Sequence, residues 1–500
     1  MNPLYDRLFG RHASRDAPFL HLSDGRAISH RDFGHMAGRM ANALAARGLV
    51  PGDRVAAQID KSPEALALYA ACARAGLVFL PLNTAYTADE VGYFVTDSGA
   101  RLFVCDPGRA GEMAEVAKAA GATLATLSGD GRGSLAEDAA SAPSEFATVA
   151  RGGSDLAAFL YTSGTTGRSK GAMLSQDNLL SNAETLAEAW RFTEGDVLLH
   201  ALPIFHTHGL FVATNVTLVA GGAMIFLPKF DAGEMIAQLP RATAMMGVPT
   251  FYTRLLAEPR FDRDLVAHMR LFVSGSAPLL SETHRAFTER TGHRILERYG
   301  MTETNMNTSN PYEGERRAGT VGQPLPGVEL RIMDGGVEVA PGETGTIEVR
   351  GPNVFQGYWN MPEKTAEELR PDGWFITGDL GTRSEDGYVT IVGRGKDLII
   401  SGGFNIYPKE VELLLDDQPG VLESAVVGVP HPDFGESPVA VLVPAPGAAP
   451  DVDAIRAAVK DGLARFKHPA RYEVVDELPR NTMGKVQKNV LRDRYAGAFG

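Results

Sequence analysis

The sequence predicts an α/β protein with a large N-terminal domain of helix-covered, mainly parallel sheets and a smaller, mobile α+β C-terminal domain. Its 500 residues, 44% of them hydrophobic, exceed the usual size of one domain. Short apolar runs alternate with helical segments in the N-terminal part, which favours parallel sheets. After residues 393–397 (GRGKD) a smaller α+β pattern begins. We therefore predict a large domain at 1–394 and a small one at 395–500.

The first helices follow from periodicity and capping residues. Apolar residues recur at spacings of three and four after Ser29, which predicts a helix with one buried face. Ser62 and Pro63 supply a cap and a first-turn proline for a helix that reaches Ala75. Residues 129–154 are rich in Gly, Ala, Ser and acidic residues without sustained periodicity, so we expect a loose connection. The predicted strands of this region are 55–59, 78–82 and 102–105, with a further helix near Glu90.

Composition excludes several broad classes. A formal net charge of -13 disfavours general binding to nucleic acid or to an anionic membrane, because both favour a basic face. Cys72 and Cys105 are too few for a disulfide framework or a zinc site, so we expect a reducing compartment. The N-terminus lacks the apolar run of a secretory signal, and no stretch approaches the roughly 18 apolar residues of a membrane span. We expect a soluble cytoplasmic protein.

A phosphate-binding loop is predicted directly after the apolar, strand-like run 156–161. Glycines let backbone N–H groups turn toward an anion, hydroxyls add donors, and Lys170 adds a positive charge. The spacing differs from the Walker pattern, and by composition alone such a run is most often a plain surface turn. The residues of the loop are Thr162, Ser163, Gly164, Thr165, Thr166, Gly167, Arg168, Ser169 and Lys170.

This loop, TSGTTGRSKG, resembles the phosphate loop of the adenylate-forming superfamily, which contains acyl-CoA synthetases, luciferases and non-ribosomal adenylation domains. Further motifs of that superfamily follow in the order in which the superfamily carries them. The resemblance implies ATP, Mg²⁺ and coenzyme A as cofactors and co-substrate. The further motifs are 299–304 (YGMTET), 377–379 (TGD), 393–397 (GRGKD) and 479–485 (PRNTMGK).

The resemblance also implies roles for individual residues in forming an acyl-adenylate. Lys485 stabilises charge on the α-phosphate, while Glu303 and Thr166 hold Mg²⁺, which prefers oxygen ligands. Asp379 accepts bonds from the ribose hydroxyls and Arg394 makes a second nucleotide contact. A single lysine or glutamate is usually a solvated surface charge, and a single tyrosine is usually part of the core. Tyr299 is expected to stack on adenine, and the other residues expected to bind the nucleotide are Ser274, Gly275, Ser276, Ala277, Gly300, Met301 and Thr302.

The second reaction, transfer of the acyl group to a thiol, requires different surroundings. Thiol attack needs a path to the carbonyl, so the small domain must reorient. By resemblance Lys396 is the hinge, and Gly402 and Gly403 line the tunnel for the pantetheine chain of coenzyme A. We also predict acetylation of Lys485 by a partner enzyme, which would regulate the first step.

The acid is predicted from three segments around the acyl pocket, 202–210, 247–254 and 304–312. They resemble those of malonyl-CoA synthetases, a branch of the superfamily, which implies malonate or methylmalonate as substrate. An arginine facing a small pocket can bind the distal carboxylate through two hydrogen bonds, and Arg254 is expected to do so. The alternative is that Arg254 points to solvent from a helix. The other candidate pocket residues are His206, also a candidate catalytic residue, Thr207, Met306, Arg285 and Arg298.

Three other functions remain open on the sequence. A stand-alone adenylation enzyme that activates another small carboxylic acid and loads it on a carrier-protein thiol would share every nucleotide motif. A luciferase-like oxygenase would favour a large aromatic acyl pocket. A non-catalytic scaffold would be expected to lose Lys485 or Glu303, and both residues are present. The sequence leaves the oligomeric state and the choice between malonate and methylmalonate open.

Overall fold

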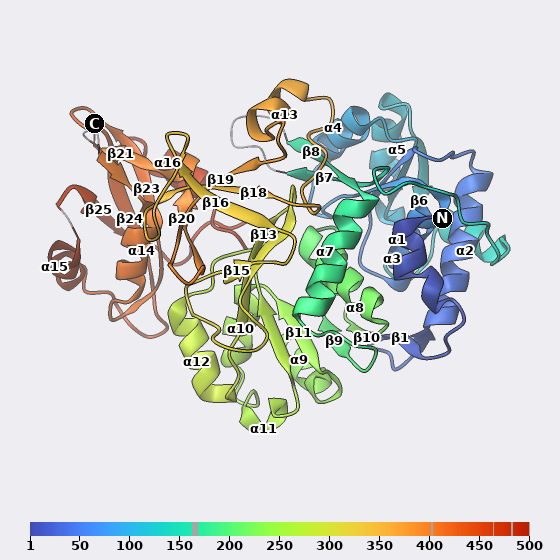
Figure 1. Ribbon diagram of the computed structural model, residues 1–500, viewed down its shortest axis with the longest axis horizontal. Helices are drawn as coiled ribbons and strands as arrows, with labels where there is room; N and C mark the ends of the chain where they lie inside the picture. The colour runs from blue at the N-terminus through green and yellow to red at the C-terminus, as the bar shows by residue number, and fades with distance from the viewer. Residues whose placement is uncertain (163–168, 402–403, 464, 482–483, 500) are drawn as a thin grey trace.

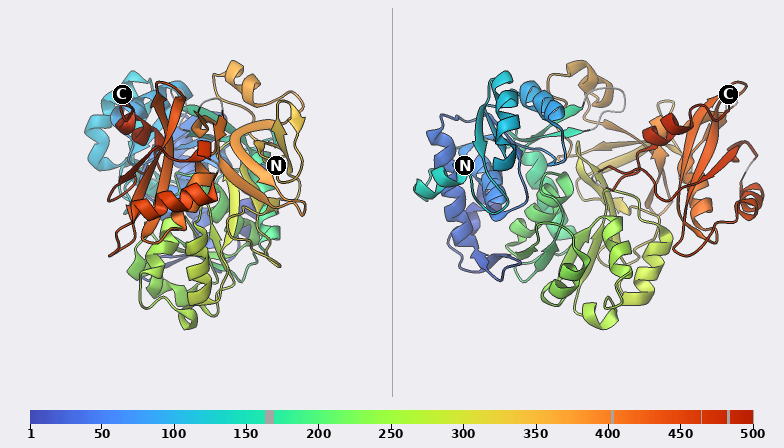
Figure 2. Two further views of the ribbon diagram at one scale, coloured as in Figure 1. Left: turned by 90° about the vertical axis from the view of Figure 1, so that its left-hand side faces the viewer. Right: turned by 180° about the vertical axis from the view of Figure 1, so that it is seen from behind.

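The computed structural model describes residues 1–162, 169–401, 404–463, 465–481 and 484–499. It confirms the α/β class, with a large N-terminal part built on parallel sheets and a smaller C-terminal part. Figure 1 shows the two ends of the chain on opposite sides of the molecule, and the views of Figure 2 place the C-terminal sheet at one extremity.

The first N-terminal sheet contains the strands predicted from the short apolar runs. Its strands are parallel except for the last pair, which is antiparallel. The two strands of that pair come directly before and shortly after residues 163–168 in the sequence, so most of the predicted phosphate loop stands between two paired strands at the edge of the sheet. The strand order is β6 (Thr123–Thr126), β5 (Leu102–Cys105), β3 (Arg54–Gln58), β4 (Val78–Pro81), β7 (Leu156–Thr162) and β8 (Lys170–Ser175).

The second N-terminal sheet is the larger one and its central strands are parallel. Because the carboxyl ends of parallel strands meet at one edge, the segments that follow these strands lie side by side. The strand order is β15 (Gln323–Pro324), β14 (Asn305–Ser309), β13 (Leu296–Met301), β12 (Leu271–Ser274), β11 (Ala244–Gly247), β9 (Val197–His200), β10 (Ala223–Phe226), β1 (Pro18–His21) and β2 (Ala27–Ser29).

Helices cover the faces of both sheets, and the capping predictions are confirmed. Ser29 caps the helix that follows it through Asp32 N–H, and Ser62 caps the next through Ala65 N–H. The helices of the N-terminal part are α1 (Pro3–Leu8), α2 (His30–Ala46), α3 (Pro63–Ala75), α4 (Ala88–Ser98), α5 (Ala110–Ala119), α6 (Ser134–Ser141), α7 (Gln176–Ala189), α8 (Asn215–Ala220), α9 (Ala232–Gln238), α10 (Pro249–Leu256), α11 (Arg263–Val266), α12 (Ser281–Thr291) and α13 (Pro362–Glu368). Short helical turns are η1 (Gly10–His12), η2 (Pro107–Arg109), η4 (Leu239–Arg241) and the π-helical η3 (His208–Thr214).

The expectation of a loose connection at 129–154 is wrong in part. Helix α6 lies within this range and packs against α2, because Leu135 and Ala139, one helical turn apart, are both buried. The polar composition therefore concealed a short amphipathic helix.

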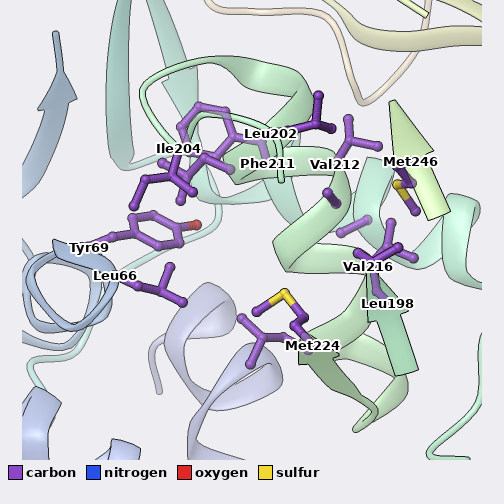
Figure 3. Packing of buried hydrophobic residues seen from close by; sticks show 14 of the residues in the cluster. Leu66, Tyr69, Leu198, Leu202, Ile204, Phe211, Val212, Val216, Met224 and Met246 are labelled. Carbon is purple, nitrogen blue, oxygen red and sulfur yellow. The ribbon is translucent and has the colours of Figure 1, made fainter. Parts of the chain in front are cut away.

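One apolar core joins the two N-terminal sheets. In Figure 3, Leu66 and Tyr69 of α3 lie on the same side as Leu202, Ile204 and Phe211, which belong to the segment that follows β9 of the second sheet. The rings of Tyr69 and Phe211 are 5.9 Å apart between centroids. The first sheet and the segment after β9 are therefore fixed to each other by packing.

Two smaller sheets complete the chain. The first is ordered β17 (Val337–Glu338), β16 (Glu329–Asp334), β18 (Gly345–Arg350), β19 (Phe375–Arg383) and β20 (Val389–Arg394). The C-terminal sheet is ordered β22 (Phe404–Ile406), β21 (Ile399–Ser401), β24 (Gly435–Pro444) and β23 (Val421–His431), with β25 (Arg471–Val474) beside β24. Its helices are α14 (Pro408–Asp416), α15 (Val452–Gly462) and α16 (Lys488–Tyr495), with turns η5 (Gly395–Asp397) and η6 (Arg465–Lys467). The boundary predicted between 394 and 395 falls between β20 and β21 and stays a prediction.

Within the described residues, no helix is both long enough and apolar enough to cross a membrane. Cys72 on α3 and Cys105 at the end of β5 are unpaired and fully buried. Burial raises the pKa of both thiols.

Candidate active site

A buried arginine stands where the parallel strands of the large sheet end. Arg298 on β13 is 4% exposed, and in the described part of the chain its Nε and Nη2 have no hydrogen-bond partner. Burial lowers the pKa of Arg298 to about 9. A buried cation without a counter-charge is energetically costly, and binding a carboxylate would compensate it. Arg298 therefore has the properties of an anion-binding group.

The segment after β9 contributes two histidines to the surroundings of Arg298. Burial, followed by the charge of Arg298, lowers the pKa of His206 to about 4 and that of His208 well below its ordinary value. Nδ1 of His208 lies 3.1 Å from Oγ of Ser276. Both imidazoles are therefore neutral hydrogen-bonding groups at pH 7, and His206 is not a cationic residue of this site. Thr207 is buried, and its hydroxyl has no partner among the described residues.

Met306 lies on β14, the strand next to β13, opposite Gly300. It is buried and lies against Gly300, where an added Cβ would be 2.6 Å from the Met306 methyl group. Asn182 on α7 holds both backbone groups of Met306: its Nδ2 donates to the carbonyl at 2.8 Å, and its Oδ1 accepts from the N–H at 3.2 Å. The backbone of Met306 is thus tied to a helix on two sides.

The other two candidate arginines do not join this cluster. Arg254 is exposed on α10, where its guanidinium lies 5.9 Å from the ring centroid of Phe230. Arg285 is exposed on α12 and lies 3.7 Å from Asp417 in the C-terminal part. The structure therefore places Arg298, and neither Arg254 nor Arg285, among the predicted pocket residues. Arg254 points to solvent because the buried face of α10 carries Phe251, Tyr252 and Leu255.

The predicted nucleotide residues come together next to Arg298, at the following residue of β13. Tyr299 donates a hydrogen bond of 2.6 Å to Oδ2 of Asp379, and Nε of Arg394 lies 3.0 Å from Oδ1. Asp379 and Arg394 are cross-strand partners on β19 and β20, which fixes this ion pair. Burial, and next the charge of Asp379, raise the pKa of Tyr299. A ring, a carboxylate and a guanidinium thus meet at one point, as expected for a nucleotide site.

Lys485 reaches this point from the C-terminal part of the chain. Its neighbouring residue Gly484 lies beside α10, because a Cβ added there would be 3.8 Å from Cγ2 of Thr250. Partial withdrawal of the Lys485 ammonium from water, followed by the charge of Arg394, lowers its pKa to about 8, while Asp379 acts in the opposite direction. The two parts of the chain therefore meet at the predicted nucleotide residues.

A carboxylate network follows on the phosphate-loop side. The hydroxyl of Tyr358 lies 3.1 Å from Oε1 of Glu303 and 2.6 Å from Oε2 of Glu368. Nζ of Lys170 lies 3.2 Å from both oxygens of Glu368 and 4.1 Å from the centroid of the Tyr358 ring. Burial raises the pKa of Glu303. The network connects the lysine of the predicted phosphate loop to the predicted magnesium carboxylate.

The fit of this region to Mg²⁺ can be judged from its donors. Within the described residues, no group of three or more His, Cys, Asp or Glu side chains could hold a metal ion. Mg²⁺ is commonly bound by one or two carboxylates together with substrate phosphates. The single buried carboxylate of Glu303, near a phosphate-loop lysine, fits that mode.

Other predicted residues lie on the same strands or in the segments that follow them, and eight fall outside the described part of the chain. Thr162 ends β7, Ser169 accepts a hydrogen bond of 2.9 Å from Tyr93 at its carbonyl, and Ser274 ends β12 with its hydroxyl buried. Gly300, Met301 and Thr302 continue from Tyr299, Gly275 and Ala277 flank Ser276, and Lys396 lies in η5 after β20. The residues outside the described chain are Ser163, Gly164, Thr165, Thr166, Gly167, Arg168, Gly402 and Gly403.

Sequence reasoning overlooked three residues of the site. His208 lies two residues after His206 in the same FHTHGL segment, and this spacing of the two histidines could have indicated it. Tyr358 and Glu368 lie outside every recognised motif, and their contacts with Glu303 and Lys170 span many residues of sequence. No local pattern predicts such contacts.

Comparison with known proteins now gives the class. Residues 9–359 match the AMP-binding enzyme family, and residues 410–485 match the AMP-binding enzyme C-terminal domain. The chain therefore belongs to the AMP-binding enzyme family, and the prediction of the adenylate-forming superfamily is confirmed. By class it is an AMP-forming acid ligase.

Particular relatives extend the match over the whole chain. The crystal structure of ATP-bound MatB from Rhodopseudomonas palustris is similar with a TM-score of 0.98 and 59% identity, covering 100% of both chains. The apo structure of the same protein has a TM-score of 0.87. Feruloyl-CoA synthase of Amycolatopsis sp is 38% identical over 476 residues, 94% of each chain. Malonate–CoA ligase of Arabidopsis thaliana is 34% identical over 484 residues, covering 89% of this chain and 78% of its own.

Proposed function

We propose that this chain is an AMP-forming malonate–CoA ligase. Malonate and ATP form malonyl-AMP and pyrophosphate, and the thiol of coenzyme A then displaces AMP to give malonyl-CoA. The observation that carries the substrate assignment is the buried guanidinium of Arg298, whose Nε and Nη2 lack partners in the described part of the chain. Methylmalonate, which differs by one methyl group, is a second candidate substrate.

The chemistry of Arg298 supports a second carboxylate on the acid. Nε and Nη2 lie on one edge of the guanidinium and match the two oxygens of a carboxylate. Neutral His206 and His208 can donate hydrogen bonds without adding charge to the pocket. Met306, buried on the next strand, would restrict the depth of the pocket. The similarity to the malonate–CoA ligase of Arabidopsis thaliana agrees with this assignment.

For the first step, we assign Lys485 to the α-phosphate, where negative charge develops as pyrophosphate leaves. Asp379 and Arg394 hold the ribose end of the nucleotide, and Tyr299 lies against adenine. Glu303, with Thr166, would hold Mg²⁺, which supplies charge neutralisation of the leaving phosphates when bound. The closer match to the ATP-bound form of the Rhodopseudomonas protein supports this assignment, because Lys485 here lies at the nucleotide residues.

For the second step, we assign residues 395–500 as a lid that turns about Lys396 and withdraws Lys485 from the site. Gly402 and Gly403 would then border the pantetheine chain of coenzyme A. Acetylation of Lys485 by a partner enzyme would remove its charge and stop the first step. We place these reactions in the cytoplasm, where unpaired Cys72 and Cys105 remain reduced.

The deciding experiment measures CoA thioester formation with malonate, methylmalonate, succinate and acetate. We expect malonate to be preferred, and preference for acetate or succinate would overturn the assignment. Arg298→Met should lower the kcat/KM for malonate about 10- to 100-fold, because a charge-assisted hydrogen bond contributes roughly 1.5 to 3 kcal/mol. Arg254→Met is the matched control and should keep the wild-type ratio of malonate to acetate.

The acceptor is tested separately. Pyrophosphate exchange that depends on malonate, without thioester formation from CoA, would leave adenylation intact and transfer the second step to a carrier-protein thiol. A carrier protein bearing phosphopantetheine, offered in the same assay, then identifies the acceptor.

A further inference from the structure

A buried lysine outside the nucleotide and acyl sites bridges the two N-terminal sheets. Lys61 lies between β3 and α3 and is 9% exposed. Its Nζ lies 2.9 Å from Nδ1 of His200, 2.8 Å from the His200 carbonyl and 3.0 Å from the Leu202 carbonyl. All three acceptors belong to the end of β9 or to the residues directly after it. Lys61 thus connects the first sheet to the start of the segment that carries His206 and His208.

The hydrogen-bonding capacity of Lys61 is fully used by these acceptors. An ammonium group has three N–H donors, and three acceptors surround it. In the described part of the chain no carboxylate forms an ion pair with it, and its Nζ lies 4.3 Å from the ring centroid of Phe226. Burial lowers the pKa of Lys61. A leucine or methionine would fill such a site at lower cost, so the hydrogen bonds are the feature that distinguishes lysine here.

His200 extends the connection to the far end of the same segment. Because burial, followed by the charge of Lys61, lowers the pKa of His200 well below its ordinary value, the ring is neutral. With Nδ1 accepting from Lys61, Nε2 carries the proton and donates to the Gly209 carbonyl at 2.9 Å. The hydroxyl of Thr214 donates to the same carbonyl at 2.9 Å. One lysine and one histidine therefore hold both the beginning and the end of residues 201–209.

Residues 201–209, the acyl-pocket segment, fold back tightly on themselves. A Cβ added at Gly209 would lie 1.9 Å from the carbonyl oxygen of Pro203. Leu202 and Ile204 pack beside Tyr69 and Phe211 (Figure 3), so the outer side of the segment is fixed. Its inner side presents His206, Thr207 and His208, and the last of these meets Ser276. Small displacements of the segment would move these side chains relative to Arg298.

We propose that Lys61, through His200, is a positioning residue that sets the selectivity of the enzyme for its acid. It touches neither the acid nor the nucleotide, and it acts by fixing the backbone of the acyl-pocket segment at both ends. The proposal rests on the proposed function only in naming malonate as the acid. A displacement of about 1 Å in a positioning group can change a rate about 100-fold, so loss of this anchor has a measurable effect.

The test compares Lys61→Met with Arg74→Met in the full-length enzyme. Arg74 on α3 is a suitable control, because it also donates to backbone carbonyls, those of Phe146 at 2.8 Å and Gly34 at 3.5 Å, away from the acyl-pocket segment. We expect Lys61→Met to raise the KM for malonate about 10-fold or more, with the KM for ATP changed less than about twofold. The ratio of kcat/KM for malonate to that for acetate should fall accordingly. Arg74→Met should lower the melting temperature without changing that ratio.

A second variant keeps the proposal testable if Lys61→Met does not fold. His200→Asn retains an acceptor for Lys61 but loses the donor to Gly209, so the ratio of malonate to acetate should fall less than in Lys61→Met. An unchanged ratio and an unchanged KM for malonate in either folded variant would overturn the proposal. If the wild type prefers another acid, the malonate assignment fails first, and the same comparison of KM values is made with the preferred acid.

Discussion

A Cβ added at Gly275 would lie 2.3 Å from Cζ of Arg298, closer than two such carbon atoms approach in folded proteins. The guanidinium of Arg298 can occupy this position because Gly275, the residue after β12, has no side chain. Gly275→Ala should displace Arg298 and raise the KM for malonate about 10-fold, with a smaller effect on acetate, because only malonate needs the guanidinium. Steady-state kinetics with both acids measures this difference. Gly111→Ala on α5, where an added Cβ meets nothing within 4 Å, is the control and should leave both KM values unchanged.

Lys485 has a pKa near the upper end of the usual assay range. Because its pKa is about 8, the ammonium loses its proton as the pH rises through that value, and adenylation should slow with it. Malonate-dependent pyrophosphate exchange, followed from pH 6.5 to 9.5, should show this decline in the wild type. Lys485→Ala should reduce exchange about 100- to 1000-fold and remove the decline in the residual rate.

The same variant separates the two half-reactions. Transfer from preformed malonyl-AMP to CoA should fall much less than adenylation in Lys485→Ala. Equal losses in both steps, in single-turnover measurements, would contradict a role limited to the first step. Lys460→Ala, which removes an exposed lysine of α15, serves as the control and should change neither step.

Lys396 lies in η5, between the last strand of the N-terminal part and the first strand of the C-terminal sheet. Proline at this position restricts φ to about −65° and should hinder rotation of the C-terminal part. Lys396→Pro should therefore keep most malonate-dependent pyrophosphate exchange and slow thioester formation. Lys396→Ala leaves φ unrestricted and should retain both reactions, and normal thioester formation by the folded proline variant would exclude Lys396 as the hinge.

Glu297 on β13 is buried, and its Oε1 has no partner among the described residues. Burial raises its pKa to about 8. The unfolded chain therefore binds fewer protons than the folded chain between pH 4.5 and 8, and the free energy of unfolding falls as the pH rises through that window. Glu297→Gln should remove this dependence, so its melting temperature relative to wild type should increase from pH 5 to pH 8 and then level. Glu289→Gln, an exposed carboxylate of α12, should show no such trend.

Much of the fold could be predicted because local signals agreed with it. The caps at Ser29 and Ser62 and the short apolar runs are local features, and the helices and strands begin within a residue of the predicted positions. The residues of the nucleotide site could be predicted from the sequence motifs. The role of Arg254 stays a prediction that the structure does not favour, because α10 carries its buried residues at 251, 252 and 255 and Arg254 is directed outward. On β13, Leu296, Glu297 and Arg298 are all buried, so no alternation in the sequence distinguishes Arg298.

The remaining features depend on contacts between distant residues. Lys61 and His200 are 139 residues apart, and Tyr358 meets Glu303 across 55 residues. Neither pair has a local sequence signature. The sequence also gives no reason to expect that Lys61 is buried, because most lysines lie at the surface.

The burial of Cys72 and Cys105 has a practical result for enzymology. Both thiols are inaccessible in the native protein and their pKa values are raised, so the reactive thiolate is scarce at neutral pH. An aromatic disulfide reagent added to the native enzyme after turnover therefore titrates the remaining coenzyme A without background from the protein. After denaturation the same reagent reacts with two further thiols per chain, so the additional thiols that it detects measure the number of unfolded molecules.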